Sequence, residues 1–380
     1  MGGSQELYDR LSEKVMAACA SETTNIKQVV NLIWVVVGIL GSGSIALSKI
    51  ANHLPGAAEA ESRVTRIRRW LNNGHVDAAR LYEQLLAQVL AGWRNVKITV
   101  VVDGTMVFGD RWQVYRLSLV HGYRAVPLAW TITSGTGVVK AKRLKQLFER
   151  AARLLAPHAK HVTLLADRGF RGRDWAELCA SVGWRYRLRV PKNTRVVLSS
   201  GRECRIDQLG VQPGEVRCYQ HVRLTRAKPF LTNLVVTWSD GDQGTPELVA
   251  VITGQRASPK TLRQYARRMD IEQSFRDDKS GGFDMAHTRL IHPERLERLL
   301  LALAIATLWC HELGEHVLES GESARRQIDP GPRRELSLFQ LGLRWIKRCL
   351  AVMLDALPRF RATLSNLRLA PVVRSVASFV

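Results

Sequence analysis

Acidic residues, paired cysteines and long apolar runs are all scarce in this sequence. The six cysteines are scattered, with no CxxC pair and no Cys/His ligand spacing, which argues against a disulfide framework and a zinc site. The most apolar stretch, Val29–Leu40, is interrupted by Asn31 and falls short of the roughly 20 residues that span a membrane, so it predicts a buried helix. No secretory signal pattern is present, and we expect a cytoplasmic protein with no membrane partner.

The shortage of acidic residues leaves a large positive charge. The 380 residues include 56 Lys and Arg against 34 Asp and Glu, a net charge of +22. Such a surplus favours a polyanionic partner, and nucleic acid is the first expectation. The hydrophobic fraction of 46% is ample for a large buried core, which excludes a disordered basic tail.

The spacing of apolar residues divides the chain into three regions. Residues 1–95 have helical spacing and predict an N-terminal helical domain that binds DNA. Within it, residues 44–73 predict two short helices around a turn, which fits either a DNA-reading helix-turn-helix or an ordinary basic, solvated helix. Residues 96–290 predict strands and helices, and residues 291–380 predict a C-terminal helical region.

The middle region predicts an α/β fold, with a mixed sheet flanked by helices. The β-branched run 97–103 is apolar on both faces, as in a central strand, and ends on Asp103. A second buried strand, 161–167, ends on Asp167. Short β-like runs between about 192 and 247 extend too far for a loop and predict an inserted β-subdomain.

Two strand ends and one helix supply candidate metal ligands. Neighbouring strand ends lie close together, so Asp103 and Asp167 are expected to reach one cation. A helix predicted over Pro259–Asp278 adds Glu272. Three carboxylates without Cys or His form a hard oxygen site that suits Mg²⁺ or Mn²⁺. Two such ions can activate the attacking oxygen and stabilise the leaving oxygen of a phosphodiester.

The same predicted helix presents several polar groups on one face. Tyr265, Arg268, Glu272 and Lys279 lie at offsets that place them within about 60° of arc. The two cations are expected to bind phosphates, and the phenol to hydrogen-bond to or stack on the DNA strand. Either cation also fits an ordinary solvated charge.

This spacing resembles the signature of the DDE transposases of the IS-four insertion-sequence type. That signature is Tyr, two residues, Arg, three residues, Glu, six residues and Lys, and all four positions match. The resemblance also covers Asp103 in Val-Val-Asp-Gly-Thr and Asp167 in Leu-Ala-Asp-Arg-Gly-Phe. It extends over about residues 96–290, including the β-insertion before the glutamate helix.

The resemblance implies an RNase H-like catalytic core in which Asp103, Asp167 and Glu272 bind two divalent ions, Mg²⁺ or Mn²⁺. It further implies cut-and-paste transposition. One strand at the transposon end is nicked, a hairpin forms and is reopened, and the freed 3′ hydroxyl attacks target DNA. The partners implied are double-stranded DNA, as terminal inverted repeats and target, and a second copy of the chain in a synaptic complex.

The hairpin step and one strand carry further expectations about DNA contacts. In the family, a tryptophan of the insertion receives a flipped base. That position falls near Val249 here, and Trp238 on a neighbouring predicted strand is the substitute candidate. Trp238 also fits a packing role. On the predicted strand 184–190, Arg187 belongs to an alternating cationic row that Lys192 continues. That row fits either a DNA-facing surface or an ordinary exposed strand face.

Three functions compete at this point. The leading hypothesis is an active transposase, associated with the nucleoid in the cytoplasm of a bacterium. A second is a transposase-derived repressor or architectural protein that binds DNA without catalysis. A third is a related nuclease that cleaves without strand transfer. The full set of three carboxylates with Tyr265, Arg268 and Lys279 favours the first hypothesis over the second.

Overall fold

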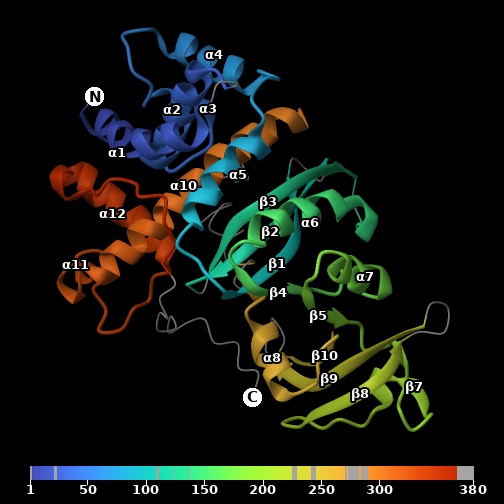
Figure 1. The fold of residues 1–380 in the computed structure, drawn as a ribbon. Helices are drawn as coiled ribbons and strands as arrows, with labels where there is room; N and C mark the ends of the chain where they lie inside the picture. The colour runs from blue at the N-terminus through green and yellow to red at the C-terminus, as the bar shows by residue number, and fades with distance from the viewer. Residues whose placement is uncertain are drawn as a thin grey trace.

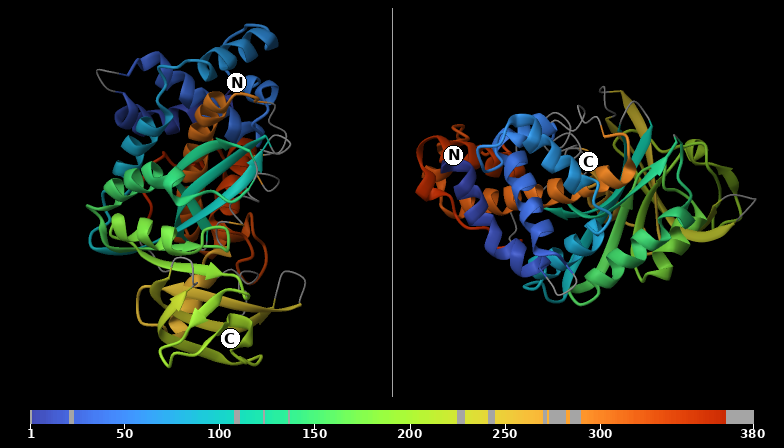
Figure 2. Two further views of the ribbon diagram at one scale, coloured as in Figure 1. Left: turned by 90° about the vertical axis from the view of Figure 1, so that its right-hand side faces the viewer. Right: turned by 90° about the horizontal axis from the view of Figure 1, so that it is seen from above.

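The computed structural model describes residues 2–20, 24–107, 111–122, 124–135, 137–224, 229–240, 245–269, 272, 282–283 and 290–365. The strands form one ten-stranded sheet, whose β1–β5 part is flanked by helices and whose inserted strands extend away at one end (Figure 1, Figure 2). Within these residues, no helix combines the length and the apolar character needed to cross a bilayer.

Five strands form the core of the sheet, in the order β3-β2-β1-β4-β5. Strand β1 (Val96–Val107) pairs antiparallel with β2 (Trp112–His121), which pairs antiparallel with β3 (Arg124–Ser134). On its other side, β1 pairs parallel with β4 (Ala159–Ala166), and β4 pairs parallel with β5 (Arg185–Val190). The predicted RNase H-like mixed sheet is therefore confirmed.

The insertion continues this sheet and does not form a separate one. Its strands are β6 (Arg195–Val197), β7 (Glu203–Arg205), β8 (Val216–Leu224), β9 (Phe230–Asp240) and β10 (Pro246–Thr253), with the short helix η1 (Ile206–Gln208). Strand β10 pairs antiparallel with the outer edge of β5 and so satisfies main-chain groups that an edge strand leaves unpaired. The predicted β-subdomain is thus an extension of the core sheet.

The described residues before β1 and after residue 290 are mainly helical. The N-terminal helices are α1 (Gly2–Cys19), α2 (Ile26–Ser42), α3 (Leu47–Ala51), α4 (Ala60–Leu71) and α5 (Ala78–Val89). The C-terminal ones are α10 (Pro293–Glu319), α11 (Glu322–Arg326), α12 (Leu338–Val352) and η4 (Leu354–Ala356). Helix α2 contains the predicted buried stretch and is covered by α1, α3 and α10, which explains its nearly continuous apolar sequence.

The alternation of strand residues assigns the helices to two layers. Helices α6 (Ala141–Leu155) and α7 (Arg173–Ser181) lie on one face, where Phe148 contacts Trp175 and Trp184 (Figure 1). Helices α10 and α8 (Pro259–Ala266) lie on the opposite face. The apolar strands β1, β2, β3 and β4 are thereby largely buried, as strands covered on both faces are expected to be.

The last described segment ties the two ends of the chain together. After η4, residues 357–365 run back along α10, where the carboxylate of Glu312 accepts hydrogen bonds from the amides of Arg361 (2.7 Å) and Thr363 (3.0 Å). The indole of Trp93, which follows α5, donates to the carbonyl of Leu364 at 2.8 Å. Buried glutamate is costly unless it is hydrogen-bonded, and here the backbone of this segment supplies the donors.

Candidate active site

The register of the two parallel strands brings the predicted aspartates together. Val101 pairs with Leu165 across β1 and β4, and both side chains are fully buried on the same face. Asp103 and Asp167 each follow two residues later, so both return to that face at the same edge of the sheet. The two strand ends thus form an acidic edge, as the sequence predicted.

Local hydrogen bonds fix each aspartate. Oδ1 of Asp103 accepts from the amide of Gly104 at 2.8 Å, and Oδ1 of Asp167 accepts from the amide of Gly169 at 2.7 Å. A carboxylate has two oxygens and about four acceptor sites, so each side chain is oriented and still has capacity for another ligand.

The charges around Asp103 show that the acidic groups converge. Burial raises the pKa of Asp103 to about 6, and the negative charges of Asp167 and Glu272 add to this rise. The Gly104 amide and the Arg268 guanidinium act in the opposite direction. Because these interactions fade with distance, the three carboxylates and the arginine occupy one neighbourhood.

The predicted long helix is shorter in the structure. Helix α8 ends at Ala266, and the amides of Arg267 and Arg268 donate to carbonyls three residues back, at 3.3 and 2.9 Å. These bonds tighten the last turn and interrupt the α-helical pattern. The prediction of one continuous helix over 259–278 is therefore wrong at this point. Most of its second half, and Lys279, lie outside the described residues.

Arg268 and Glu272 contact each other directly. Nη2 of Arg268, a residue only 9% exposed, donates to Oε1 of Glu272 at 2.5 Å. The guanidinium thus supplies a positive charge among the carboxylates. With Glu272 engaged in this pair, no three His, Cys, Asp or Glu side chains of the described residues are grouped closely enough to hold a metal ion as they stand.

Tyr265 is buried, whereas its spacing predicts a place among the polar side chains that contact DNA. Its side chain is 3% exposed and packs in a cluster with Val235, Val249 and Val251. Burial raises the pKa of its phenol to about 12. The reason is that α8 lies against β9 and β10, so the side of the helix that bears Tyr265 is covered by the sheet.

The other predicted DNA contacts are divided between buried and exposed positions. Arg187 is 7% exposed and donates to neutral side chains on β10 and α8, so the sheet face that bears it is covered and does not form an open DNA-facing row. Lys192 is exposed and contributes positive charge near Glu247. The indole of Trp238 is half-buried and donates to the carbonyl of Val211 at 2.7 Å.

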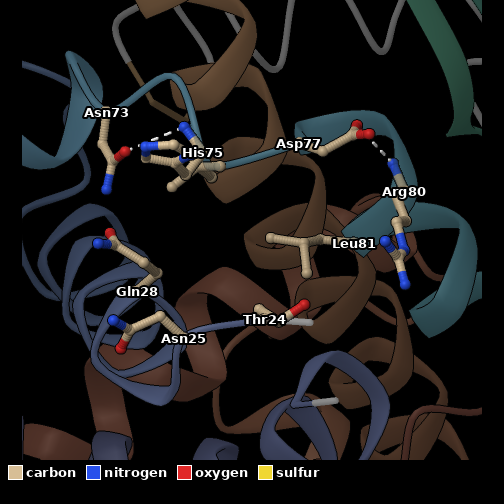
Figure 3. Close-up of a pocket in the computed structure, with 9 residues that line it drawn as sticks. Thr24, Asn25, Gln28, Asn73, His75, Asp77, Arg80 and Leu81 are labelled. Atoms are coloured by element: carbon tan, nitrogen blue, oxygen red, sulfur yellow. Dashed lines mark hydrogen bonds between the residues drawn. The ribbon is translucent and has the colours of Figure 1, made fainter. Parts of the chain in front are cut away.

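A separate cavity of about 280 Å³ lies among the N-terminal helices (Figure 3). Two of its polar side chains cap helices: Asn25 accepts from the amide of Lys27, and Asp77 accepts from the amide of Arg80. Its lining consists of Thr24, Asn25, Gln28, Asn73, His75, Val76, Asp77, Arg80 and Leu81. The cavity shares no residue with the acidic edge, so the acidic edge is the candidate active site.

A mixed sheet with acidic residues at the ends of two neighbouring strands is expected of a DDE domain. Residues 94–309 match the family model of the transposase DDE domain. The match covers more than half of the 380 residues, and the chain belongs to this family. No curated protein sequence matches the chain.

The chain is also similar to solved structures, at low sequence identity. PiggyBac transposase, in a synaptic complex with hairpin DNA, has a TM-score of 0.44 and 10% identity, with 98% of this chain and 85% of that chain covered. An Argonaute from Marinitoga piezophila with a 5′ OH guide RNA has a TM-score of 0.24 and 10% identity, with 58% and 34% covered. The family assignment therefore rests on the sequence match.

Proposed function

We propose that this chain cleaves DNA at the ends of a transposon and joins those ends to target DNA, in a reaction that requires divalent metal ions. The observation that most supports the proposal is the shared edge of Asp103 and Asp167 on neighbouring parallel strands, with Glu272 in the same electrostatic neighbourhood. Family membership supports the reaction class. The net charge of +22 supports a DNA substrate.

In this proposal, Asp103, Asp167 and Glu272 would hold two Mg²⁺ ions, for which Mn²⁺ would substitute. When bound, such ions activate an attacking oxygen and stabilise the leaving oxygen at a phosphodiester. The donor set fits, because it offers only carboxylate oxygens. The pKa of Asp103 is raised mainly by burial and further by the charges of Asp167 and Glu272, and a bound cation would offset those two charges. Glu272 would exchange its bond to Arg268 for the metal, which would free the guanidinium for a DNA phosphate.

The proposed substrates are the terminal inverted repeats and the target DNA, bound by a homodimer in a synaptic complex. We assign DNA binding to the helical domain of residues 1–95 and to Lys192 and Lys279, and catalysis to residues 96–290. Helix α10 contacts α2 and α5 of the N-terminal part and β3 of the core sheet. Hairpin formation is the proposed route of cleavage, with Trp238 as the candidate to accept a flipped base.

A second candidate function is DNA binding without catalysis. The direct pairing of Glu272 with Arg268 favours it, since a metal ion would have to compete with the guanidinium for this carboxylate. The two functions differ in one observable, which is metal-dependent strand cleavage.

The test uses purified protein and a labelled duplex that ends in the element's own terminal repeat, with Mg²⁺, Mn²⁺ or EDTA. Wild type is compared with Glu272→Ala and with Asp174→Asn, which changes an exposed acidic residue on the first turn of α7. We expect metal-dependent cleavage at the repeat boundary, a hairpin on a denaturing gel, and loss of both in Glu272→Ala alone. Tight binding to the repeat without cleavage in all three proteins would establish the second function.

A further inference from the structure

Arg187 is a buried cation held by neutral groups. Its guanidinium donates to Thr253 Oγ1 at 2.5 Å and to Gln255 Oε1 at 2.6 Å, and it contacts Gln264 Oε1 from two nitrogens, at 3.1 and 3.3 Å. A further bond goes to the carbonyl of Tyr186 at 2.7 Å. Among the described residues, Arg187 forms no ion pair with a carboxylate, although it is only 7% exposed.

Burial of the Arg187 charge among neutral groups lowers the stability of the fold. Burial lowers the pKa of Arg187 to about 10, so the side chain stays charged at neutral pH. A buried charge without an opposite charge costs several kcal/mol, and an apolar side chain at this position would avoid that cost. Packing alone therefore does not explain an arginine here. The planar guanidinium explains it better, because it binds several oxygens at fixed angles.

The fork joins three elements that meet behind the acidic edge. Arg187 is on β5, Thr253 ends β10, and Gln264 is on α8. Arg187 pairs in register with Leu165, which lies two residues before Asp167 on β4, so the fork lies on the sheet face that bears the acidic edge. Gln264 lies two residues before the end of α8 at Ala266, and Arg268, which contacts Glu272, lies two residues after that end.

We propose that Arg187 is a positioning residue, whose guanidinium fixes the rotation of α8 against β5 and thereby holds Arg268 and Glu272 beside Asp103 and Asp167. Of the residues that accept its hydrogen bonds, Thr253 ends β10, Gln255 follows just beyond β10, and Gln264 is on α8. A rigid contact on Gln264 sets the direction in which the chain leaves the helix at Ala266. The inference rests on the proposed function, because it gives Arg187 a role in that same site.

The test compares Arg187→Met with Arg153→Met, which makes the same change at an exposed position on α6, on the opposite face of the sheet. Two measurements are made: hydrogen exchange of the full-length protein in the segment 259–268, and cleavage of the terminal-repeat duplex over a range of Mg²⁺ and DNA concentrations. Arg187 contacts none of the three proposed metal ligands, so its loss would act on them through α8; loss of residues that orient metal ligands typically lowers metal affinity or activity by roughly 10–100-fold.

For Arg187→Met, we therefore expect faster exchange confined to 259–268, a higher Mg²⁺ requirement and a kcat lower by roughly 10–100-fold, with the KM for DNA unchanged. Arg153→Met should behave like wild type. Arg187→Lys, which restores the charge but not the fork, should recover only part of the rate. If Arg187→Met does not fold, Gln264→Met, which removes the acceptor on α8, should give the same pattern.

Other results would overturn the inference. Unchanged exchange in 259–268 would show that α8 does not depend on Arg187. Faster exchange throughout the chain with an unchanged kcat would show that Arg187 only stabilises the fold. If wild type cleaves no DNA, the proposed function fails and the affinity for Mn²⁺ is measured in place of the cleavage rate. Weaker Mn²⁺ binding by Arg187→Met, with faster exchange confined to 259–268, would then still support the positioning role. Equal Mn²⁺ binding by wild type and Arg187→Met would overturn the positioning role as well.

Discussion

Replacing Asp103 with asparagine should stabilise the metal-free protein while abolishing its activity. The pKa of Asp103 rises from 3.8 to about 6, mainly through burial and then through the charge of Asp167. One pKa unit is worth about 1.4 kcal/mol, so ionised Asp103 costs the fold up to about 3 kcal/mol at pH 7. Because the side chain is only partly buried, we expect a gain of about 1–3 kcal/mol in Asp103→Asn. The asparagine oxygen retains the bond from Gly104.

The sign of this effect depends on pH in a definite way. The raised pKa means that the folded state holds the Asp103 proton more tightly than the unfolded chain does. The cost is therefore absent below about pH 3.8, grows as the pH rises towards about 6, and is complete at pH 7. The advantage of Asp103→Asn should follow the same course, so it should be small at pH 4.5 and full at pH 7.5.

Thermal unfolding in EDTA at pH 4.5 and pH 7.5 measures this difference, with Asp174→Asn as the control for loss of an exposed acidic charge. Added Mg²⁺ should raise the melting temperature of wild type but not that of Asp103→Asn, because only the folded protein with its carboxylates binds the ion. Equal or lower stability of Asp103→Asn at pH 7.5, or an advantage of the same size at both pH values, would refute the electrostatic reasoning.

Three further predictions concern packing, the C-terminal segment and DNA binding. A Cβ atom on Gly342 of α12 would lie 1.9 Å from the carbonyl oxygen of Cys310 on α10. Gly342→Ala should therefore lower the free energy of unfolding by about 2 kcal/mol or more. An unchanged melting temperature would contradict this close approach of the two helices. Glu312→Ala removes a buried carboxylate that accepts from the amides of Arg361 and Thr363, and it should cost about 2–4 kcal/mol. Trypsin should then cut within 357–365 faster than in wild type, and equal rates would show that the segment is held by other contacts. Binding of the terminal repeat should weaken steeply between low and physiological salt, as measured by fluorescence anisotropy, and a flat salt profile would exclude phosphate contacts as the main source of affinity.

The two aspartates were predictable from sequence because their signal is local. A run of β-branched residues specifies a buried strand whatever surrounds it, and a carboxylate directly after such a run lies at the edge of the sheet. Asp103 and Asp167 both follow such runs, and their strands prove to be parallel neighbours. The four-residue spacing of Arg268 and Glu272 likewise brought those side chains together.

Arg187 and Tyr265 show where sequence reasoning stopped. Alternating arginine and apolar residues on β5 fit a strand face in solvent as well as one covered by a helix. Helical spacing places Tyr265 on a polar face but does not state which side of α8 meets the sheet. Gln255 and Gln264, which bind Arg187, had no sequence signal, because amide side chains that accept hydrogen bonds from a distant residue form no motif.

The sequence by itself determined the family, the mixed α/β core and the acidic residues, because each depends on patterns within a few residues of one another. The tertiary structure alone decided that the insertion continues the core sheet, that α8 ends at Ala266 and covers Arg187, and that residues 357–365 return to α10. Those features depend on contacts between segments far apart in the chain. Their free energy comes from burial and hydrogen bonds that no local pattern encodes.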